Sequence, residues 1–427
     1  MTPAARLAAA IDILADIETR HRPAADALKD WGLSHRFAGS KDRAAIATLV
    51  FDALRCRASS AWIMGEATPR AILLGTLRQM RGLAVEDIAA LCSGEHHAPS
   101  PLSEGETARL AAASLAGAPM HVRGDFPEWL EAAFSEAFDD PVAEGRALAA
   151  RAPLDLRVNR LKTTRDKARA ALAHLGAESA PYSPIGLRIP LLSDGRNPPL
   201  TAEPAYLKGH VEIQDEGSQL AALLCNTRPG EQVLDLCAGG GGKTLALAAE
   251  MENHGQIYAT DLDPRRLAAI HARLERAGTR NVQVRTPRGG ADVIADLAGR
   301  CDLVLVDAPC TGTGTWRRNP DAKWRIRPSS LAQRLKEQDE VIEKASLYVR
   351  KGGRLVYVTC SLLPAENEER LTRFLAAHEA FVPMPLADLT AALPDLMRFA
   401  ARSGLGLRLS PQRSGTDGFF VAGLLRN

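Results

Sequence analysis

The chain of 427 residues lacks several features that mark whole classes of protein. Its longest stretch without a charged side chain covers about a dozen residues and ends at Val122. A membrane-spanning helix needs roughly 20 apolar residues, so the sequence predicts none. The apolar run near the N-terminus is interrupted at Asp12, too early for a secretory signal. We therefore expect a globular protein with no membrane partner.

Paired cysteines are also missing. The seven cysteines are an odd number, lie far apart and form no C-x-x-C pair. This spacing argues against a disulfide framework and against a structural zinc site. We expect a reducing, cytoplasmic compartment and no bound metal, so that any functional cysteine acts as a thiolate.

Net charge is nearly absent, at +2, and aromatic residues make up only 5% of the chain. The small net charge hides an uneven distribution. Residues 1–140 hold 14 basic and 19 acidic side chains, and residues 141–427 hold 39 and 32. One segment, residues 316–336, has seven Lys/Arg and a single acid, with Trp316 and Trp324 between them. Such a segment suits contact with nucleic acid, although a solvated charged face is the simpler alternative.

The pattern of apolar residues predicts three regions. Residues 1–140 read as helical, with a helical stripe formed by Ile46, Leu49, Val50, Ala53 and Leu54. Residues 141–205 contain strand-like runs at 154–162 and 186–190, a helix at 166–176 and a stretch rich in Pro and Gly. Residues 206–427 alternate strands and helices, which predicts a parallel sheet covered on both faces. The expected strands are 232–238, 256–263, 281–285, 302–309, 353–360 and 418–425.

A run of glycines lies between the first of these strands and a helix, in VLDLCAGGGGKT (233–244). A phosphate-binding P-loop would need glycine where Cys237 stands, so this interpretation fails on spacing. The loop otherwise suits a ligand at the carboxyl end of a strand, and Asp261, about 20 residues on, suits ribose hydroxyls. The ligand could be a dinucleotide or S-adenosylmethionine, and tight packing alone could also require the glycines.

Two cysteines, Cys310 and Cys360, directly follow two other strands of the same sheet. A cysteine beside an adenosine ligand suits methylation of cytosine at C5, a carbon that is not nucleophilic. A thiolate that adds to C6 activates C5, and a base must later remove the C5 proton. The residues alone do not say which cysteine attacks.

Five ordered motifs give a resemblance over about residues 205–427: DLCAGGGGKT, ATDLDPRR, VDAPCTGTGTWRRNPDAKW, YVTCSLLPAENE and GTDGFF. Together they resemble the RNA cytosine-C5 methyltransferases of the Sun/Nop2 superfamily. RVNRLKTTRDKARAAL is similar to the small RNA-recognition-like extension of these enzymes, and KDRAAIATLVFDALR resembles a helical NusB-like domain. The resemblance implies a Rossmann-like α/β methyltransferase domain (206–427), an all-α NusB-like RNA-binding domain (1–140) and an α+β extension with linker (141–205).

The resemblance also implies the roles of site residues. It makes Cys360 the nucleophile that attacks C6, and Cys310 a residue that assists product release. It places Lys243 and Asp307 near both the cofactor and the flipped cytosine. It assigns the binding of S-adenosylmethionine to Cys237, Ala238, Gly239, Gly240, Gly241, Gly242, Lys243, Asp261, Arg266 and Asp307.

The implied substrate is small-subunit (16S) rRNA, free or in an assembly intermediate, and a monomer is the default. Candidate phosphate contacts are Arg317, Arg318, Lys323, Arg325 and Arg327. A non-catalytic RNA-binding assembly factor is the rival hypothesis, disfavoured by the intact cysteines.

Two positions depart from the family pattern. Gly239 and Gly240 stand where the family has Ala-Pro, and Arg288 stands where it has an acid after the third strand, with Asp292 several residues later. The adenine contact is therefore left open.

Overall fold

A computed structural model describes residues 1–192, 197–287, 289 and 292–427. It divides into two compact units, one formed by Met1–Ala150 with Trp316–Ile326 and the other by Arg151–Thr315 with Arg327–Asn427. Across these described ranges, no helix combines the length and apolar character needed to cross a bilayer. The helical unit thus runs past residue 140 and takes in a segment from far along the chain.

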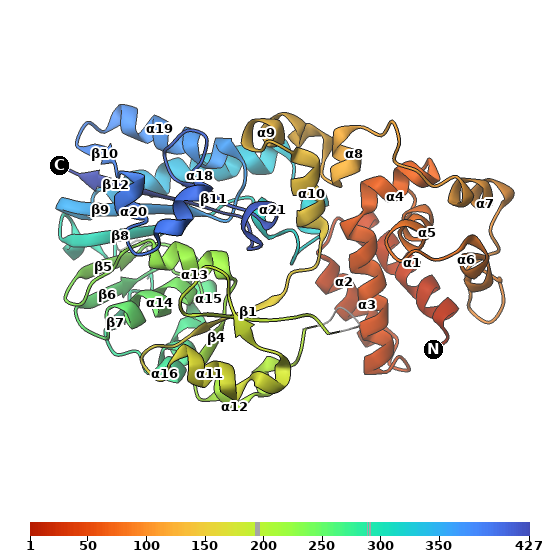
Figure 1. The fold of residues 1–427 in the computed structure, drawn as a ribbon, viewed down its shortest axis with the longest axis horizontal. Coiled ribbons are helices and arrows are strands. Elements are labelled where there is room, and N and C mark those ends of the chain that lie inside the picture. Colours follow the sequence, from red (N-terminus) through yellow and green to blue (C-terminus); the bar gives the residue numbers. More distant parts are fainter. Residues whose placement is uncertain (193–196, 288, 290–291) are drawn as a thin grey trace. The chain divides into compact units, whose positions relative to one another are not determined.

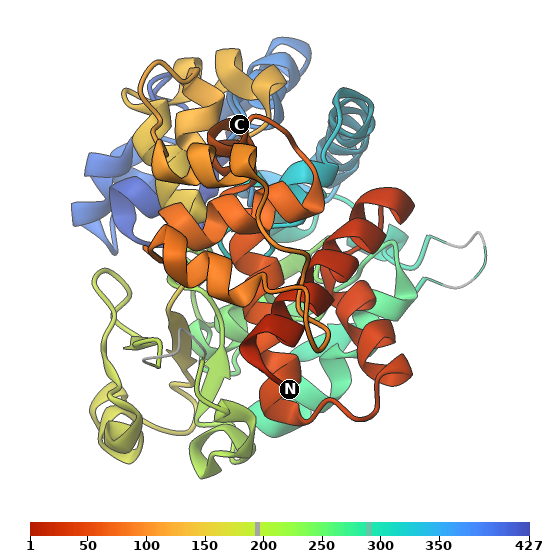
Figure 2. The ribbon, with the colours of Figure 1, turned by 90° about the vertical axis from the view of Figure 1, so that its right-hand side faces the viewer.

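The first unit is helical, as the sequence predicts (Figures 1 and 2, red to orange). Its helices are α1 (Pro3–Arg20), α2 (Ala24–Ser34), α3 (Ser40–Arg55), α4 (Arg57–Met64), α5 (Pro69–Gln79), α6 (Val85–Leu91), α7 (Glu104–Ala111), α8 (Met120–Gly124), η1 (Glu128–Leu130), α9 (Glu131–Ala137), α10 (Pro141–Ala149) and α17 (Ala322–Arg325). Side-chain caps begin several of them: the Thr2 hydroxyl accepts from the Ala5 N–H, and Ser103 and Glu106 form a capping box. The predicted stripe on α3 is buried in the core of this unit.

The segment Trp316–Ile326 is part of the helical unit although it follows a strand of the other unit. The indole N–H of Trp324 donates to the Leu54 carbonyl at 2.6 Å, and the Lys323 ammonium donates to the Arg55 carbonyl at 2.9 Å. Both carbonyls belong to the last turn of α3, where no helical N–H remains to satisfy them. The segment therefore completes the end of this helix.

We expect Lys323→Ala to destabilise the helical unit, because Lys323 is only 1% exposed. Loss of its packed methylenes and of its hydrogen bond should lower the free energy of unfolding by about 2–4 kcal/mol. Thermal and urea unfolding of the full chain measure this. Arg327→Ala is the matched control, since Arg327 is exposed, and equal loss in both variants would contradict the buried role.

The same residue gives a pH signature. Burial lowers the pKa of Lys323 to about 8, although Asp125 opposes the shift. Between about pH 8 and 10.5, the unfolded chain therefore holds a proton that the folded chain has released. Stability should rise with pH across that window in the wild type. The Lys323→Ala variant should lack this part of the rise.

The second unit contains a small antiparallel sheet in the order β2-β3-β1-β4. Its strands are β1 (Leu154–Val158), β2 (Glu178–Ser179), β3 (Gly186–Ile189) and β4 (Val211–Ile213), with α11 (Arg165–Ala171) and η2 (Ala173–Leu175) beside them. The strand predicted over 154–162 ends at Val158, because Asn159 turns the chain. The Oδ1 atom of Asn159 accepts from the Leu161 N–H, and its Nδ2 donates to the Gly209 carbonyl. β4 lies beyond the predicted boundary at residue 205.

The larger sheet has the order β10-β12-β9-β8-β5-β6-β7, with β11 paired to β12. Its strands are β5 (Gln232–Asp235), β6 (Gln256–Ala259), β7 (Val282–Val284), β8 (Cys301–Asp307), β9 (Val349–Thr359), β10 (Phe381–Pro383), β11 (Leu407–Leu409) and β12 (Phe419–Arg426). Strands β5 to β9 are mutually parallel, and β12 is antiparallel to β9. The predicted Rossmann-like arrangement of a mainly parallel sheet is found in this region.

Helices cover both faces of this sheet (Figure 1). Along β8, Leu303 and Leu305 enter one core with α13 and α14, and Val304 and Val306 enter the other with α18 and α19. This alternation is the two-residue period of a strand buried on both faces. The helices are α12 (Pro204–Leu207), α13 (Glu216–Leu223), α14 (Gly242–Glu250), α15 (Pro264–Ala268), α16 (Ile270–Ala277), α18 (Pro328–Ser346), α19 (Glu368–Ala377), α20 (Leu386–Leu389) and α21 (Pro411–Ser414), with η3 (Leu200–Ala202), η4 (Ala295–Leu297), η5 (Thr313–Thr315), η6 (Pro364–Glu366) and η7 (Pro394–Phe399).

Candidate active site

Two cysteines meet at the carboxyl edge of the larger sheet. Cys310 follows β8 and Cys360 follows β9, and these strands are parallel neighbours. The two Sγ atoms lie 3.4 Å apart. The Gly314 N–H donates to the Cys360 carbonyl at 2.9 Å, which joins the two loops. The structure thus brings together the two residues that the sequence singled out for chemistry.

The two thiols differ in their electrostatic surroundings. The contact with Cys360 and burial raise the pKa of Cys310 well above its ordinary value, and Glu366 adds to the effect. A thiol with a raised pKa holds its proton more tightly. Either sulfur can be the donor of the contact that joins the pair.

Glu366, at the end of η6, holds both cysteine loops and was missed by the sequence analysis. Its Oε1 accepts from the Thr311 N–H at 2.8 Å and from the Gln338 amide at 2.9 Å. Its Oε2 accepts from the hydroxyls of Thr311 and Ser361. Thr311 follows one cysteine and Ser361 follows the other, so a single buried carboxylate fixes both. Its place within YVTCSLLPAENE was the only available signal.

We expect Glu366→Ala to lower the rate of the reaction at the cysteine pair at least about tenfold, because buried donors beside both cysteines lose their acceptor. Glu366→Gln keeps the shape and should retain an intermediate rate. Single-turnover rates, with substrate binding measured separately, test this. The matched control is Glu343→Gln, an exposed glutamate that pairs with His378. Loss of substrate affinity with an unchanged rate would contradict a positioning role.

Lys243 and Asp307 form an ion pair beside the cysteines. The Lys243 ammonium donates to Asp307 Oδ2 at 2.7 Å, and its Nζ lies 5.2 Å from the centre of the Phe419 ring. Burial lowers the pKa of Lys243, but the Asp307 carboxylate outweighs this and raises it. Cys360 also acts on Lys243 electrostatically. A fixed ammonium and carboxylate therefore stand next to the proposed nucleophile.

The glycine loop from Cys237 to Gly242 joins β5 to α14 and is partly held by its own contacts. Gly239 and Gly241 have φ of 51° and 80°, which other residues rarely adopt. A Cβ on Gly241 would collide with the Ile270 side chain, so packing requires this glycine. The Gly240 carbonyl accepts from Arg273 at 2.6 Å. Packing thus accounts for part of the loop, as the sequence analysis allowed.

Asp261 faces this loop, and its remaining acceptor capacity fits an adenosine-bearing ligand. Its Oδ2 accepts from the Gly239 N–H and its Oδ1 from the Asp263 N–H, each at 2.9 Å. A carboxylate has about four acceptor positions, so about two remain for ribose hydroxyls. Leu262, next in the chain, is 81% exposed and offers an apolar surface to a base. Arg266 lies 3.8 Å from Asp261 and pairs with it.

Asp235 is the last residue of β5 and a further buried acid that the sequence analysis did not select. Its Oδ2 accepts from the Thr244 hydroxyl at 2.7 Å, and its Oδ1 is a buried oxygen with no partner among the described residues. Burial raises its pKa to about 7. Asp235 ties the strand to the first turn of α14, which positions Lys243.

The predicted RNA-contact residues divide into buried and exposed sets. Lys323 and Arg317 are buried, and the ammonium of Lys323 is used on the Arg55 carbonyl. For these two the expectation of a surface phosphate contact is corrected, because burial withdraws their charges from a phosphate. Arg325 and Arg327 are exposed and Arg318 is half-buried. The phosphate-contact prediction stays with these three.

The two residues that depart from the family pattern after the third strand have different outcomes. Arg288 lies outside the described residues. Asp292 Oδ2 accepts from the Tyr348 hydroxyl at 3.1 Å, so it is engaged with the segment before β9.

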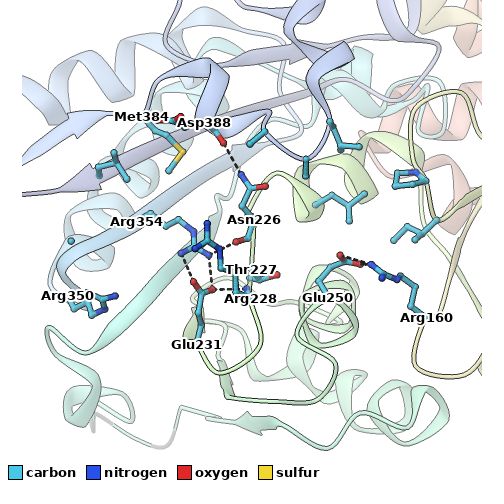
Figure 3. Close-up of a pocket in the computed structure, with 18 residues that line it drawn as sticks. Arg160, Asn226, Thr227, Arg228, Glu231, Glu250, Arg350, Arg354, Met384 and Asp388 are labelled. Atoms are coloured by element: carbon cyan, nitrogen blue, oxygen red, sulfur yellow. Dashed lines mark hydrogen bonds and ion pairs between the residues drawn. The ribbon is translucent and has the colours of Figure 1, made fainter.

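A cavity of about 900 Å³ lies at the opposite, amino edge of the parallel strands (Figure 3). Arg354 pairs with Glu231 and Arg160 pairs with Glu250 on its walls. None of the predicted site residues lines it. It is therefore separate from the cysteine site.

Comparison with known proteins matches two family models. The model described as 16S rRNA methyltransferase RsmB/F matches residues 222–425, and the RsmF/B-like ferredoxin-like domain matches residues 126–191. A probable ribosomal RNA small subunit methyltransferase B of Synechocystis is 34% identical over 305 residues, and the methyltransferase B of Photorhabdus laumondii is 34% identical over 303. Each match covers 70% of this chain and 66%, just under two thirds, of the relative.

Solved structures agree on the fold. The crystal structure of PH0851 is 24% identical and superposes with a TM-score of 0.70 over 99% of both chains. A methyltransferase homolog from Pyrococcus horikoshii is 26% identical, with a TM-score of 0.58 over 72% of this chain and 98% of that one.

Proposed function

This chain belongs to the RsmB/F methyltransferase family, and from that membership we propose that it methylates C5 of a cytosine in small-subunit (16S) rRNA. The observation that carries the proposal is the pair of sulfurs 3.4 Å apart at the carboxyl edge of the sheet. A reaction that needs only a nucleophile would require one cysteine at this edge of the sheet. A second thiol at hydrogen-bond distance suits a reaction in which a covalent adduct must also be resolved.

The proposed first step is addition of the Cys360 thiolate to C6 of the cytosine. The S–C6 bond forms, and the electrons of the C5=C6 bond move into the ring. Protonation at N3, or a fixed cation beside the ring, neutralises the negative charge that this places on the base. Lys243 and Asp307 stand beside Cys360 as the candidate groups for polarising the base. C5 thereby becomes nucleophilic.

S-adenosylmethionine is the methyl donor of this family, and when bound it supplies the electrophilic methyl group that C5 takes up. Asp261 and the Cys237–Gly242 loop are the residues that would hold it, and their free acceptor positions fit its ribose. A base then removes the C5 proton, the electrons of that C–H bond re-form the C5=C6 bond as the S–C6 bond breaks, and any proton taken up at N3 is released. Cys360 leaves as a thiolate, and Cys310, within contact of it, assists this release.

The substrate is proposed as rRNA, with the helical unit as an RNA-binding domain of NusB-like type and the small sheet as an RNA-recognition-like extension. Arg318, Arg325 and Arg327 are the proposed phosphate contacts, since they keep exposed surface. Their replacement by alanine should weaken binding similarly across RNA sequences and flatten its salt dependence.

The experiment is methylation of unmethylated 16S rRNA, supplied both as a transcript and within small subunits, followed by bisulfite mapping. One cytosine should become resistant to deamination, only when S-adenosylmethionine is present. No resistant cytosine in either substrate would overturn the proposal. Binding without methylation would instead support the rival assembly-factor hypothesis.

A further inference from the structure

The turn between α2 and α3 exposes an aromatic ring, and the last turn of α2 exposes an apolar side chain beside it in the sequence. Phe37 is 74% exposed and Leu33 is 59% exposed. Aromatic residues form only 5% of the chain, and most phenylalanines in the structure are buried. Packing within the helical unit therefore does not explain why the Phe37 ring is exposed to water.

The exposed ring is the last of three rings in contact. Trp31 and His35 stack with centroids 4.3 Å apart and planes at 8°, and Phe37 meets His35 edge-on at 5.7 Å. Both the backbone N–H and Nδ1 of His35 lie 2.9 Å from the Trp31 carbonyl. Arg43 donates to the Ala38 carbonyl at 2.9 Å and holds the far end of the turn. Phe37 is thus presented on a pre-ordered support, which lowers the entropy lost on binding.

The charge around the ring is positive. Arg36 and Lys41, on either side of Phe37 in the chain, are both exposed, and among the described residues neither has an ion-pair partner. The nearest acids in the sequence are already neutralised: Asp30 pairs with Arg22, and Asp42 pairs with Arg6 and the N-terminal ammonium. The cations of this turn are therefore available to an anionic partner.

We propose that the α2–α3 turn binds single-stranded RNA, with an unpaired base stacked on Phe37 and the flanking phosphates on Arg36 and Lys41. An aromatic platform with flanking cations is the general means of holding unstacked bases. A protein partner would need acidic side chains placed to match these two cations, whereas an RNA backbone supplies an anionic phosphate beside every base. The inference rests on the proposed RNA substrate, for which it names a contact surface in the helical unit.

The test measures binding of a fluorescein-labelled 12-nucleotide single-stranded RNA to the full chain. Phe37→Ala should weaken binding about tenfold. Phe37→Trp should retain it, and Phe37→Leu, which keeps an apolar side chain without a ring, should behave like alanine. Arg36→Ala and Lys41→Ala should each reduce the salt slope by about 0.7. Leu347→Ala, which changes a leucine that is 62% exposed, is the matched control and should bind like the wild type.

Wild-type affinity in Phe37→Leu would overturn stacking, because it would show that apolar contact suffices. Wild-type affinity in Phe37→Ala, or equal loss in Leu347→Ala, would overturn the site. Ultraviolet crosslinking of the RNA to a peptide containing Phe37 would support it, and capture of a protein by this turn in place of RNA would refute it. Methyl transfer is measured separately. If RNA binding depends on Phe37 but no methyl transfer occurs, the proposed function is wrong and the binding site on this turn still stands.

Discussion

Replacement of Cys360 by serine should abolish methyl transfer to 16S rRNA, with a loss of at least about 10³-fold. A hydroxyl is a far weaker nucleophile toward C6 than a thiolate, and in the proposed mechanism Cys310 assists release and does not attack. Incorporation of a radiolabelled methyl group into the RNA measures the rate.

The control for this variant is Cys225→Ala, which removes a buried cysteine that follows α13 and whose carbonyl accepts from Arg354. It should leave transfer within a few-fold of the wild type. Normal methylation by the Cys360 variant would remove the covalent mechanism from the proposal.

Replacement of Cys310 by serine should have a different outcome, namely accumulation of protein linked to RNA. Cys360 can still attack C6, but the group that helps it leave is gone from its position 3.4 Å away. We expect a species that survives denaturing electrophoresis, shifted by the mass of the RNA, and a turnover at least about 10²-fold slower.

The double replacement of Cys310 and Cys360 makes this test specific. It should give no linked species, because the attacking sulfur is absent. An adduct in the double variant would show that another residue attacks, and normal turnover in the single Cys310 variant would show that product release needs no second thiol.

The sheet and its cysteines could be predicted from the sequence because short apolar strands carry a local signal. The open-sheet rule then places the residues after β8 and β9 at one edge. Glu366 could not be found in this way, since its role depends on hydrogen bonds to Thr311 and Gln338, which are distant in the sequence.

For the basic segment, residues 316–336, the sequence suggested contacts that the fold does not allow for every residue. Its charges suggested one exposed face, yet Lys323 is buried because the last turn of α3 offers it a carbonyl. Composition reports how many cations a segment holds, but only the tertiary fold decides which of them remain in water. The exposed Phe37 was likewise hidden from sequence reasoning, where a lone phenylalanine in a helical region reads as core.

The placement of Trp316–Ile326 within the helical unit has a consequence for synthesis of the chain. Residues 1–150 leave the ribosome first, but the piece that completes the end of α3 follows 165 residues later. At about 5–20 residues per second, that delay is roughly 8–33 s. During it, the Leu54 and Arg55 carbonyls lack their final donors, so the N-terminal helices reach full stability only after four of the eight strands of the larger sheet have been made. The helical unit is therefore completed only after about half of the second unit's larger sheet has been synthesised.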